Sequence, residues 1–209
     1  MKPAEFKTKW AKFSGKESAA YQSHFDDLCR LLKVQPPLLA DPSGETFCFQ
    51  KKVVKDAELF DTRKTASSAP HERGFADVWK NGCFAWEYKT KHKDLDIAYK
   101  QLLRYREGLL NPPLLVVCDF DRYIIKTNFN GTVQEKYEFT NAEIDRPENL
   151  RILRALFECP NDLKPKHTTA EVTETLAGKI AEVALSLQKR ESVEIADADV
   201  LQGGRRTHG

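Results

Sequence analysis

An Asn-Gly pair between two aromatic-rich runs constrains the fold of this chain more than any other feature. Asn81-Gly82 separates residues 74–79 from residues 83–89, and such a pair between β-prone runs favours a tight hairpin turn. Successive side chains of a strand point to opposite faces. One face of the second strand would carry Phe84, Trp86 and Tyr88, and the other Cys83, Ala85, Glu87 and Lys89. We therefore predict an antiparallel strand pair whose aromatic face packs against a helix.

The expected hairpin brings Asp77, on the first strand, near Glu87 and Lys89 at the end of the second. Mg²⁺ takes oxygen ligands and keeps several waters, so one or two carboxylates and a substrate phosphate are enough to hold it. The ion acidifies a bound water and stabilises charge on an attacked phosphate, and a nearby lysine adds a fixed positive charge. The three residues predict a metal-dependent nuclease site with Asp77 and Glu87 as metal ligands. The alternative is an exposed hairpin with a surface ion pair.

An amphipathic helix is expected over residues 94–108, because Asp94 stands at its start and apolar residues follow at helical spacing. Gln101 and Tyr105 are four residues apart and share one face of this helix. Their polar tips suit contacts with a phosphate or with the catalytic carboxylates. The alternative is that Tyr105 is a half-buried helix residue and Gln101 is solvated.

Asp77, the Glu-Tyr-Lys of residues 87–89 and the Gln-Leu-Leu-Arg-Tyr of residues 101–105 together resemble the PD-(D/E)xK nuclease superfamily. The match is to its branch with a Gln-x-x-x-Tyr motif on the helix after the catalytic strand. The resemblance is closer still to the amino-terminal nuclease region of MmeI-like single-chain restriction-modification enzymes, and it spans about residues 1–165. The stretches that carry it are residues 22–29, 74–80, 86–105 and 111–119.

The resemblance implies a catalytic set of Asp77, Glu87 and Lys89, with Ala76 in place of the proline that names the superfamily. It further implies Mg²⁺ as cofactor, with Mn²⁺ able to substitute, and double-stranded DNA as substrate. A methyltransferase and a target-recognition region would follow downstream in the parent protein. In the resembled nucleases an acidic residue on the first helix often joins the metal site, and Glu17 is the candidate. The alternative is that Glu17 only caps that helix.

The remaining pattern predicts an α/β fold, with a mixed central sheet flanked by helices as in restriction endonucleases. A capping box at residues 14–17 predicts a first helix over residues 15–33, on which His24 is expected to be structural. Residues 56–73 are expected to form a loop, either one that closes over DNA or an ordinary insertion. Further strands are expected at residues 45–54, 114–118, 123–127 and 133–139.

The carboxyl-terminal part of the chain has a different character. A second capping box at residues 168–171 precedes an apolar stripe at helical spacing, made by Val172, Leu176, Ile180, Val183 and Leu187. We expect a nuclease domain over residues 1–165, a helical connector over residues 166–190 and a disordered tail over residues 191–209.

Composition is consistent with one hydrophobic core, since the 209 residues are 41% hydrophobic. No apolar run approaches the roughly 18 residues of a membrane span, and the amino terminus lacks a signal-like stretch, so a cytoplasmic location without membrane association is expected. The five cysteines include no Cys-x-x-Cys pair and are expected to be reduced.

The net charge of +2 argues against a general polyanion binder, but the charge is unevenly distributed. Residues 80–106 contain seven lysines and arginines and three acidic residues, which gives a positive excess beside the expected site. Within this region we expect Lys91 and Lys93 to contact a DNA backbone. The expected function is that of a Mg²⁺-dependent DNA endonuclease domain of a larger restriction-modification enzyme. The alternatives are a catalytically silent domain of this fold that binds DNA or couples to a methyltransferase, and a structural interaction module.

Overall fold

The computed structural model describes residues 1–53 and 74–203 of the chain. Within these residues six strands form one sheet in the order of the sequence. The strands are β1 (Phe47–Val53), β2 (Gly74–Lys80), β3 (Phe84–Tyr88), β4 (Leu114–Cys118), β5 (Arg122–Thr127) and β6 (Lys136–Thr140). All neighbouring strands are antiparallel except β3 and β4, which are parallel and joined through the helix α5 (Leu95–Tyr105). The predicted mixed sheet is confirmed.

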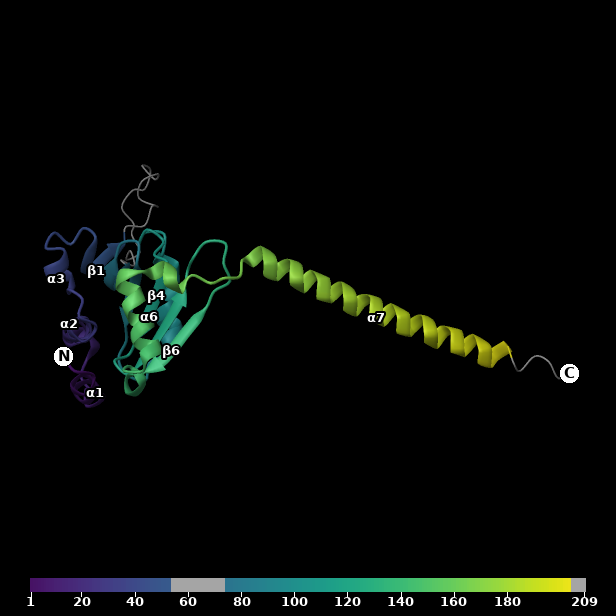
Figure 1. The fold of residues 1–209 in the computed structure, drawn as a ribbon, viewed down its shortest axis with the longest axis horizontal. Helices are drawn as coiled ribbons and strands as arrows, with labels where there is room; N and C mark the ends of the chain where they lie inside the picture. The colour runs from purple at the N-terminus through teal and green to yellow at the C-terminus, as the bar shows by residue number, and fades with distance from the viewer. Residues whose placement is uncertain (54–73, 204–209) are drawn as a thin grey trace, which may run out of the picture. The chain divides into compact units, whose positions relative to one another are not determined.

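Helices cover both faces of the sheet. One face carries α1 (Pro3–Ala11), α2 (Tyr21–Leu32) and α6 (Pro147–Glu158), the last of which is seen over the sheet in Figure 1. The other face carries α5, which packs on β3 and β4. Short helices occur at α3 (Pro37–Ala40) and at the 3₁₀ turns η1 (Glu17–Ala19), η2 (Asn141–Glu143) and η3 (Pro160–Leu163).

Each covered face has its own hydrophobic cluster. The aromatic core is built around the side chains of Phe6, Trp10, Phe25, Phe47, Phe84, Trp86, Tyr88, Phe120, Tyr123, Phe139 and Phe157. The α5 core is built from Ala76, Trp79, Ala85, Leu95, Ala98, Tyr99, Leu102, Tyr105, Leu109, Leu115, Val117 and Ile124. In β3 the aromatic residues belong to the first cluster and Ala85 to the second, which confirms the predicted alternation. Phe25 of α2 meets Trp86 edge-on, with ring centroids 5.4 Å apart.

The predicted hairpin is also confirmed, because β2 and β3 pair in antiparallel fashion around a turn in which Gly82 has a φ of +66°. Asp94 caps α5 by accepting a hydrogen bond from the Asp96 amide at 2.8 Å. The helix ends at Tyr105, three residues before the expected end. The strands differ from the expected ranges by up to three residues at their ends. The predicted loop at residues 56–73 lies outside the described residues.

The prediction of one helix over residues 15–33 was wrong. The chain instead forms α1, which sequence analysis missed, then η1 and then α2, and Ser14 does not cap a helix. Lys16 is extended, with a ψ of 139°, and Ala20 has a φ of −131°, so the backbone leaves helical geometry on both sides of η1. The signals of α1 were Pro3 at its first position and the buried pair Phe6 and Trp10, four residues apart.

The chain divides into two compact units, residues 1–165 and residues 166–209. The second unit contains α7 (Thr169–Gly203), and the predicted capping box forms there: the Thr168 amide donates to Glu171 at 2.9 Å, and the Glu171 amide donates to the Thr168 hydroxyl at 3.2 Å. The helix continues past residue 190, where a disordered tail was expected, because no glycine or proline interrupts it between Gly178 and Gly203. No helix among the described residues is long and apolar enough to cross a membrane.

Candidate active site

Asp77 and Glu87 lie where the pairing of β2 with β3 ends. The last paired residues on this side are Val78 and Trp86, and the same register would place Asp77 opposite Glu87. Instead of continuing the backbone ladder, the Asp77 carboxylate accepts a hydrogen bond from the Tyr88 amide, with Oδ2 2.7 Å from the nitrogen. The side chain of Asp77 thus replaces a backbone acceptor. The two strands separate at the point where both carboxylates are presented.

An irregularity in the neighbouring strand accompanies this separation. Gln50 of β1 falls in the register position opposite Asp77 and has a left-handed φ of +53°, which is unfavourable for a residue other than glycine. Before Gln50, Phe49 packs against the aromatic core, whereas after it Val53 packs against the α5 core. The alternation of side chains between the two faces of β1, an edge strand, is therefore reversed at Gln50.

The same change of face occurs in β2. Val78 belongs to the aromatic core and Ala76 to the α5 core, although side chains two residues apart in a regular strand share a face. The regular alternation of β2 is therefore interrupted at Asp77. We conclude that a paired distortion of β1 and β2, at Gln50 and Asp77, accompanies the Asp77 contact with β3.

Burial dominates the electrostatics of this pair. Glu87 is 5% exposed, and burial together with the Asp77 charge raises the pKa of Glu87 to about 7 against the opposing effect of Lys89. Burial also raises the pKa of Asp77 to about 6, although the Tyr88 hydrogen bond lowers it. Glu17 on η1 raises the pKa of both carboxyls through its own charge. Glu17 therefore lies within electrostatic range of the pair, and its role at a metal site stays a prediction.

Lys89 is bonded to one oxygen of Glu87, with Nζ 2.6 Å from Oε1. Burial acts to lower the pKa of this lysine, but the Glu87 carboxylate and the charges of Glu17 and Asp77 together outweigh burial, and the net shift is upward. The other oxygen, Oε2, is buried and has no hydrogen-bond partner among the described residues. A buried carboxylate oxygen without a partner is costly. Glu87 thus keeps one unsatisfied acceptor oxygen in the buried site.

These residues fit a hard divalent cation. Among the described residues, His, Cys, Asp and Glu form no group of three or more with the spacing of a complete metal cage. Mg²⁺ does not require such a cage, because it keeps several waters and binds through one or two carboxylates plus substrate phosphates. Asp77 and Glu87 supply two carboxylates, and the unpartnered Oε2 supplies a free acceptor.

A comparison with protein families identifies the family of the chain. Residues 1–190 match the family described as MmeI, N-terminal domain. The chain belongs to this family. The resemblance to MmeI-like enzymes is thereby confirmed, and the matched region includes every candidate site residue. A comparison with curated proteins found no match. A comparison with solved structures found no match either.

In this MmeI-type domain Gln101 and Tyr105 both lie on α5, as predicted, and Tyr105 contacts the start of β2. Tyr105 is 6% exposed in the α5 core, and its ring covers Gly74, since a Cβ atom on that glycine would lie 2.6 Å from the ring. Gln101, one turn earlier on α5, is half-buried. Sequence analysis did not identify Gly74 as a partner of Tyr105, although a glycine three residues before Asp77 was the available signal. The roles expected for Gln101 and Tyr105 in cleavage stay predictions.

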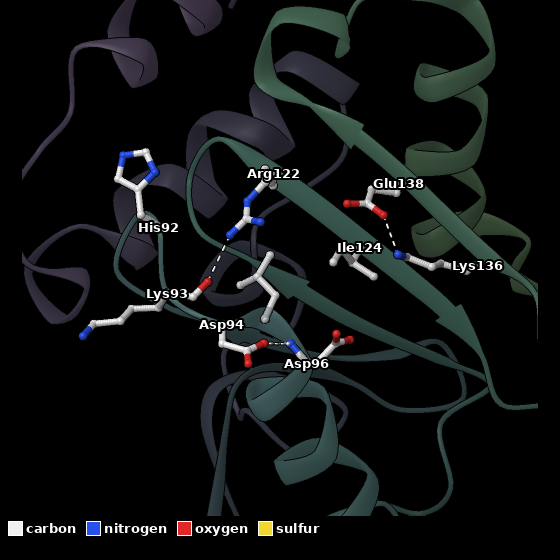
Figure 2. Close-up of a pocket in the computed structure, with 9 residues that line it drawn as sticks. His92, Lys93, Asp94, Asp96, Arg122, Ile124, Lys136 and Glu138 are labelled. Carbon is white, nitrogen blue, oxygen red and sulfur yellow. Dashed lines mark hydrogen bonds and ion pairs between the residues drawn. The ribbon is translucent and has the colours of Figure 1, made fainter.

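The two lysines expected at the DNA backbone have different surroundings. Lys91 donates from Nζ to the carbonyls of Trp10 and Ala11, at 3.0 and 3.1 Å, and so caps the end of α1. Lys93 is exposed, and Figure 2 shows its side chain pointing away from the neighbouring groove. The structural role of Lys91 was not foreseen because α1 was missed. Contact of either lysine with DNA stays a prediction.

The groove beside Lys93 has a volume of about 400 Å³ and lies between residues 92–96 and the strands β5 and β6 (Figure 2). Arg122 crosses it to donate to the Lys93 carbonyl at 3.0 Å. Of the described residues that line it, three carry positive charge, three carry negative charge and none is Asp77, Glu87 or Lys89. The balanced lining gives no preference for a phosphate, so the groove is not assigned to the candidate active site.

Proposed function

We propose that this domain is a PD-(D/E)xK nuclease that hydrolyses phosphodiester bonds of double-stranded DNA with Mg²⁺, as the cleavage module of a restriction-modification enzyme. The observation that carries the proposal is the buried Glu87 beside Asp77, with one oxygen held by Lys89 and the other without a partner. Membership of the MmeI N-terminal family supports it. By the same proposal, a methyltransferase and a target-recognition region follow in the parent protein.

Mg²⁺, for which Mn²⁺ would substitute, supplies a Lewis acid that acidifies a bound water and neutralises charge on the attacked phosphate. Asp77 and Glu87 would hold the ion, and Glu17 would add a third acidic group near it. The Tyr88 amide fixes the direction of the Asp77 carboxylate. Lys89 would keep a positive charge beside the scissile phosphate, since the nearby carboxylates hold its ammonium protonated.

The helix α5 would support this arrangement. Tyr105 packs on the start of β2, three residues before Asp77, and Gln101 lies one turn away on the same helix. We assign both to orienting the substrate phosphate or the acidic groups. Because neither would hold the metal, their loss would impair cleavage less than loss of Asp77.

The test compares two glutamates that differ in burial. In the full chain, Glu87→Gln removes the proposed metal ligand, and Glu107→Gln removes an exposed carboxylate after α5. Mn²⁺ binding is followed by electron paramagnetic resonance, and DNA cleavage is measured in the parent enzyme with Mg²⁺. We expect Glu87→Gln to abolish both Mn²⁺ binding and DNA cleavage. Glu107→Gln should retain both.

Asp77→Ala and Lys89→Ala are expected to abolish cleavage with the fold intact. Retained cutting by Glu87→Gln would remove the metal assignment. DNA binding by the wild-type chain without Mn²⁺ binding would instead favour a catalytically silent domain of the same fold.

A further inference from the structure

A buried histidine lies directly behind the candidate active site. His24 of α2 is fully buried in the aromatic core, with its ring centroid 4.7 Å from that of Trp10 and 5.3 Å from that of Phe120. Its two ring nitrogens contact two tyrosine hydroxyls: Nδ1 lies 2.8 Å from Tyr88 Oη, and Nε2 lies 3.0 Å from Tyr123 Oη. The histidine thus connects α2 to β3 and β5 through side chains.

Tyr88 connects this histidine to the acidic pair. Its hydroxyl bonds to His24 on the aromatic side of the sheet, while its backbone amide donates to Asp77. It also follows Glu87 directly in β3. A displacement of Tyr88 would therefore change the position of both carboxylates. Tyr88 is the only residue described in the structure that contacts His24 with its side chain and Asp77 with its backbone.

On its β2 side, β3 is held at this position by a side chain and not by the backbone ladder. Its pairing with β2 ends at Trp86, so on the β2 side the Asp77 carboxylate is the bond that holds the Tyr88 amide. On the other side Tyr88 pairs with Cys118 of β4. Where a ladder is incomplete, a buried side-chain bond becomes an important restraint on strand position.

The chemistry of the His24 imidazole suits a residue that bonds to two buried hydroxyls. Burial, and then the charges of Lys9 and Lys91, lower the pKa of His24 to about 3. The ring is therefore neutral and has one donor and one acceptor nitrogen. A hydroxyl can donate or accept, so two tyrosines satisfy both nitrogens. The histidine can hold both strands without placing a charge in the core.

We propose that His24 is a positioning residue, which holds Tyr88 through its hydroxyl and thereby sets the geometry of Asp77 and Glu87 for metal binding. The effect on metal binding rests on the proposed function. The effect on the Tyr88 amide does not. The two parts can therefore fail separately in experiment.

Two tyrosines provide a matched pair of variants in the full chain. Tyr88→Phe and Tyr123→Phe each remove one hydroxyl from a fully buried ring, and each breaks one bond to the same histidine. Only the first releases β3 at the site. The first readout is amide hydrogen exchange of residue 88 in the metal-free chain, measured relative to Trp86 in the same strand. The second is the dissociation constant for Mn²⁺, measured by electron paramagnetic resonance at a temperature where both variants are folded.

We expect Tyr88→Phe to speed exchange of the residue 88 amide and to weaken Mn²⁺ binding by about tenfold, the size expected for loss of a group that orients a metal ligand. Tyr123→Phe should leave both values within about twofold of wild type. Equal effects of the two variants would overturn the proposal and leave His24 a purely structural residue. A wild-type chain that binds no Mn²⁺ would refute the proposed function, while the exchange measurement would still decide the role of His24.

If Tyr88→Phe does not fold, His24→Asn provides the second variant, since its shorter side chain releases both hydroxyls. Its residue 88 amide should again exchange faster than that of Trp86, by more than in Tyr123→Phe. An unchanged ratio in folded His24→Asn would count against the proposal.

Discussion

The free energy of folding and the proposed chemistry compete at Glu87. Burial raises its pKa to about 7 and that of Asp77 to about 6, so the metal-free domain holds protons that the unfolded chain has already released. Ordinary values are about 4 for both residue types. Between these values the folded state binds more protons than the unfolded state, and stability therefore falls as pH rises. The proposed cation site would therefore destabilise the domain when no cation is bound.

This competition predicts a pH-dependent effect of Glu87→Gln. Without divalent metal, the stability of the variant relative to wild type should increase as pH rises from about 5 to about 8. His24 acts oppositely: its pKa is lowered, so its contribution is lost as pH falls below about 6.5. Both proteins contain His24, so its effect cancels in the difference. Urea denaturation across this pH range, in chelator, provides the measurement, with Glu107→Gln as control. A difference that does not change with pH would contradict the raised pKa values.

The two loop lysines, Lys91 and Lys93, lead to a second prediction. Lys91→Ala removes the bonds to the end of α1 and should lower the free energy of unfolding by about 1 kcal/mol. Lys93→Ala should change it by less than about 0.5 kcal/mol, because that side chain is exposed. Both variants should bind DNA more weakly and with a shallower salt dependence. Denaturation and DNA titration of the same samples separate the contribution of each lysine to stability from its contribution to DNA binding. Equal stability of both variants would contradict the capping role of Lys91.

At the scale of elements, sequence periodicity predicted much of the sheet and α5. The Asn-Gly turn, the alternation along β3 and the capped start of α5 depend on local sequence, and all three are confirmed. The apparent capping box at residues 14–17 is also local, and it misled the prediction of the first helix. The missed α1 depends on tertiary packing, because it buries Phe6 and Trp10 in the aromatic core. The Asp77 bond to the Tyr88 amide was not predictable, since it requires the ladder to end at Val78.

The contact between α5 and β2 gives a third prediction. Gly74→Ala would place a Cβ atom 2.6 Å from the Tyr105 ring, so the ring or the strand must move. We expect a loss of about 1–3 kcal/mol in stability, the usual cost of overpacking a core, and reduced cleavage by the parent enzyme.

A double-mutant cycle checks this cause. In a Tyr105→Ala background the ring is absent, and Gly74→Ala should then cost less than half as much. An equal cost in both backgrounds would show that the glycine is needed for a reason other than this contact.

At the scale of the whole molecule, the distribution of charge gives a prediction for DNA binding. The net charge is only +2, while residues 80–106 carry the local positive excess. Lysine contacts to phosphate position a protein without reading sequence. We therefore predict weak binding of the isolated chain to DNA, without sequence preference and with poor cleavage. Binding should fall by about 10- to 100-fold between about 50 and about 200 mM salt. Titration of two unrelated duplexes over that range tests this, and a strong preference that survives high salt would place target recognition within this chain.

The order of the strands has a consequence for how the domain folds. Every strand pairs with its neighbours in the sequence, so assembly of the sheet proceeds largely by adjacent segments closing onto one another. Only residues 119–121 separate β4 from β5, and Asp119 accepts hydrogen bonds from the amides of Asp121 and Arg122 there. Short loops of this kind have a low entropic barrier to closure and favour rapid folding. We expect the β4–β5 hairpin to form early and to serve as the template on which β3, with the carboxylate of Glu87, is added through the longer α5 crossover.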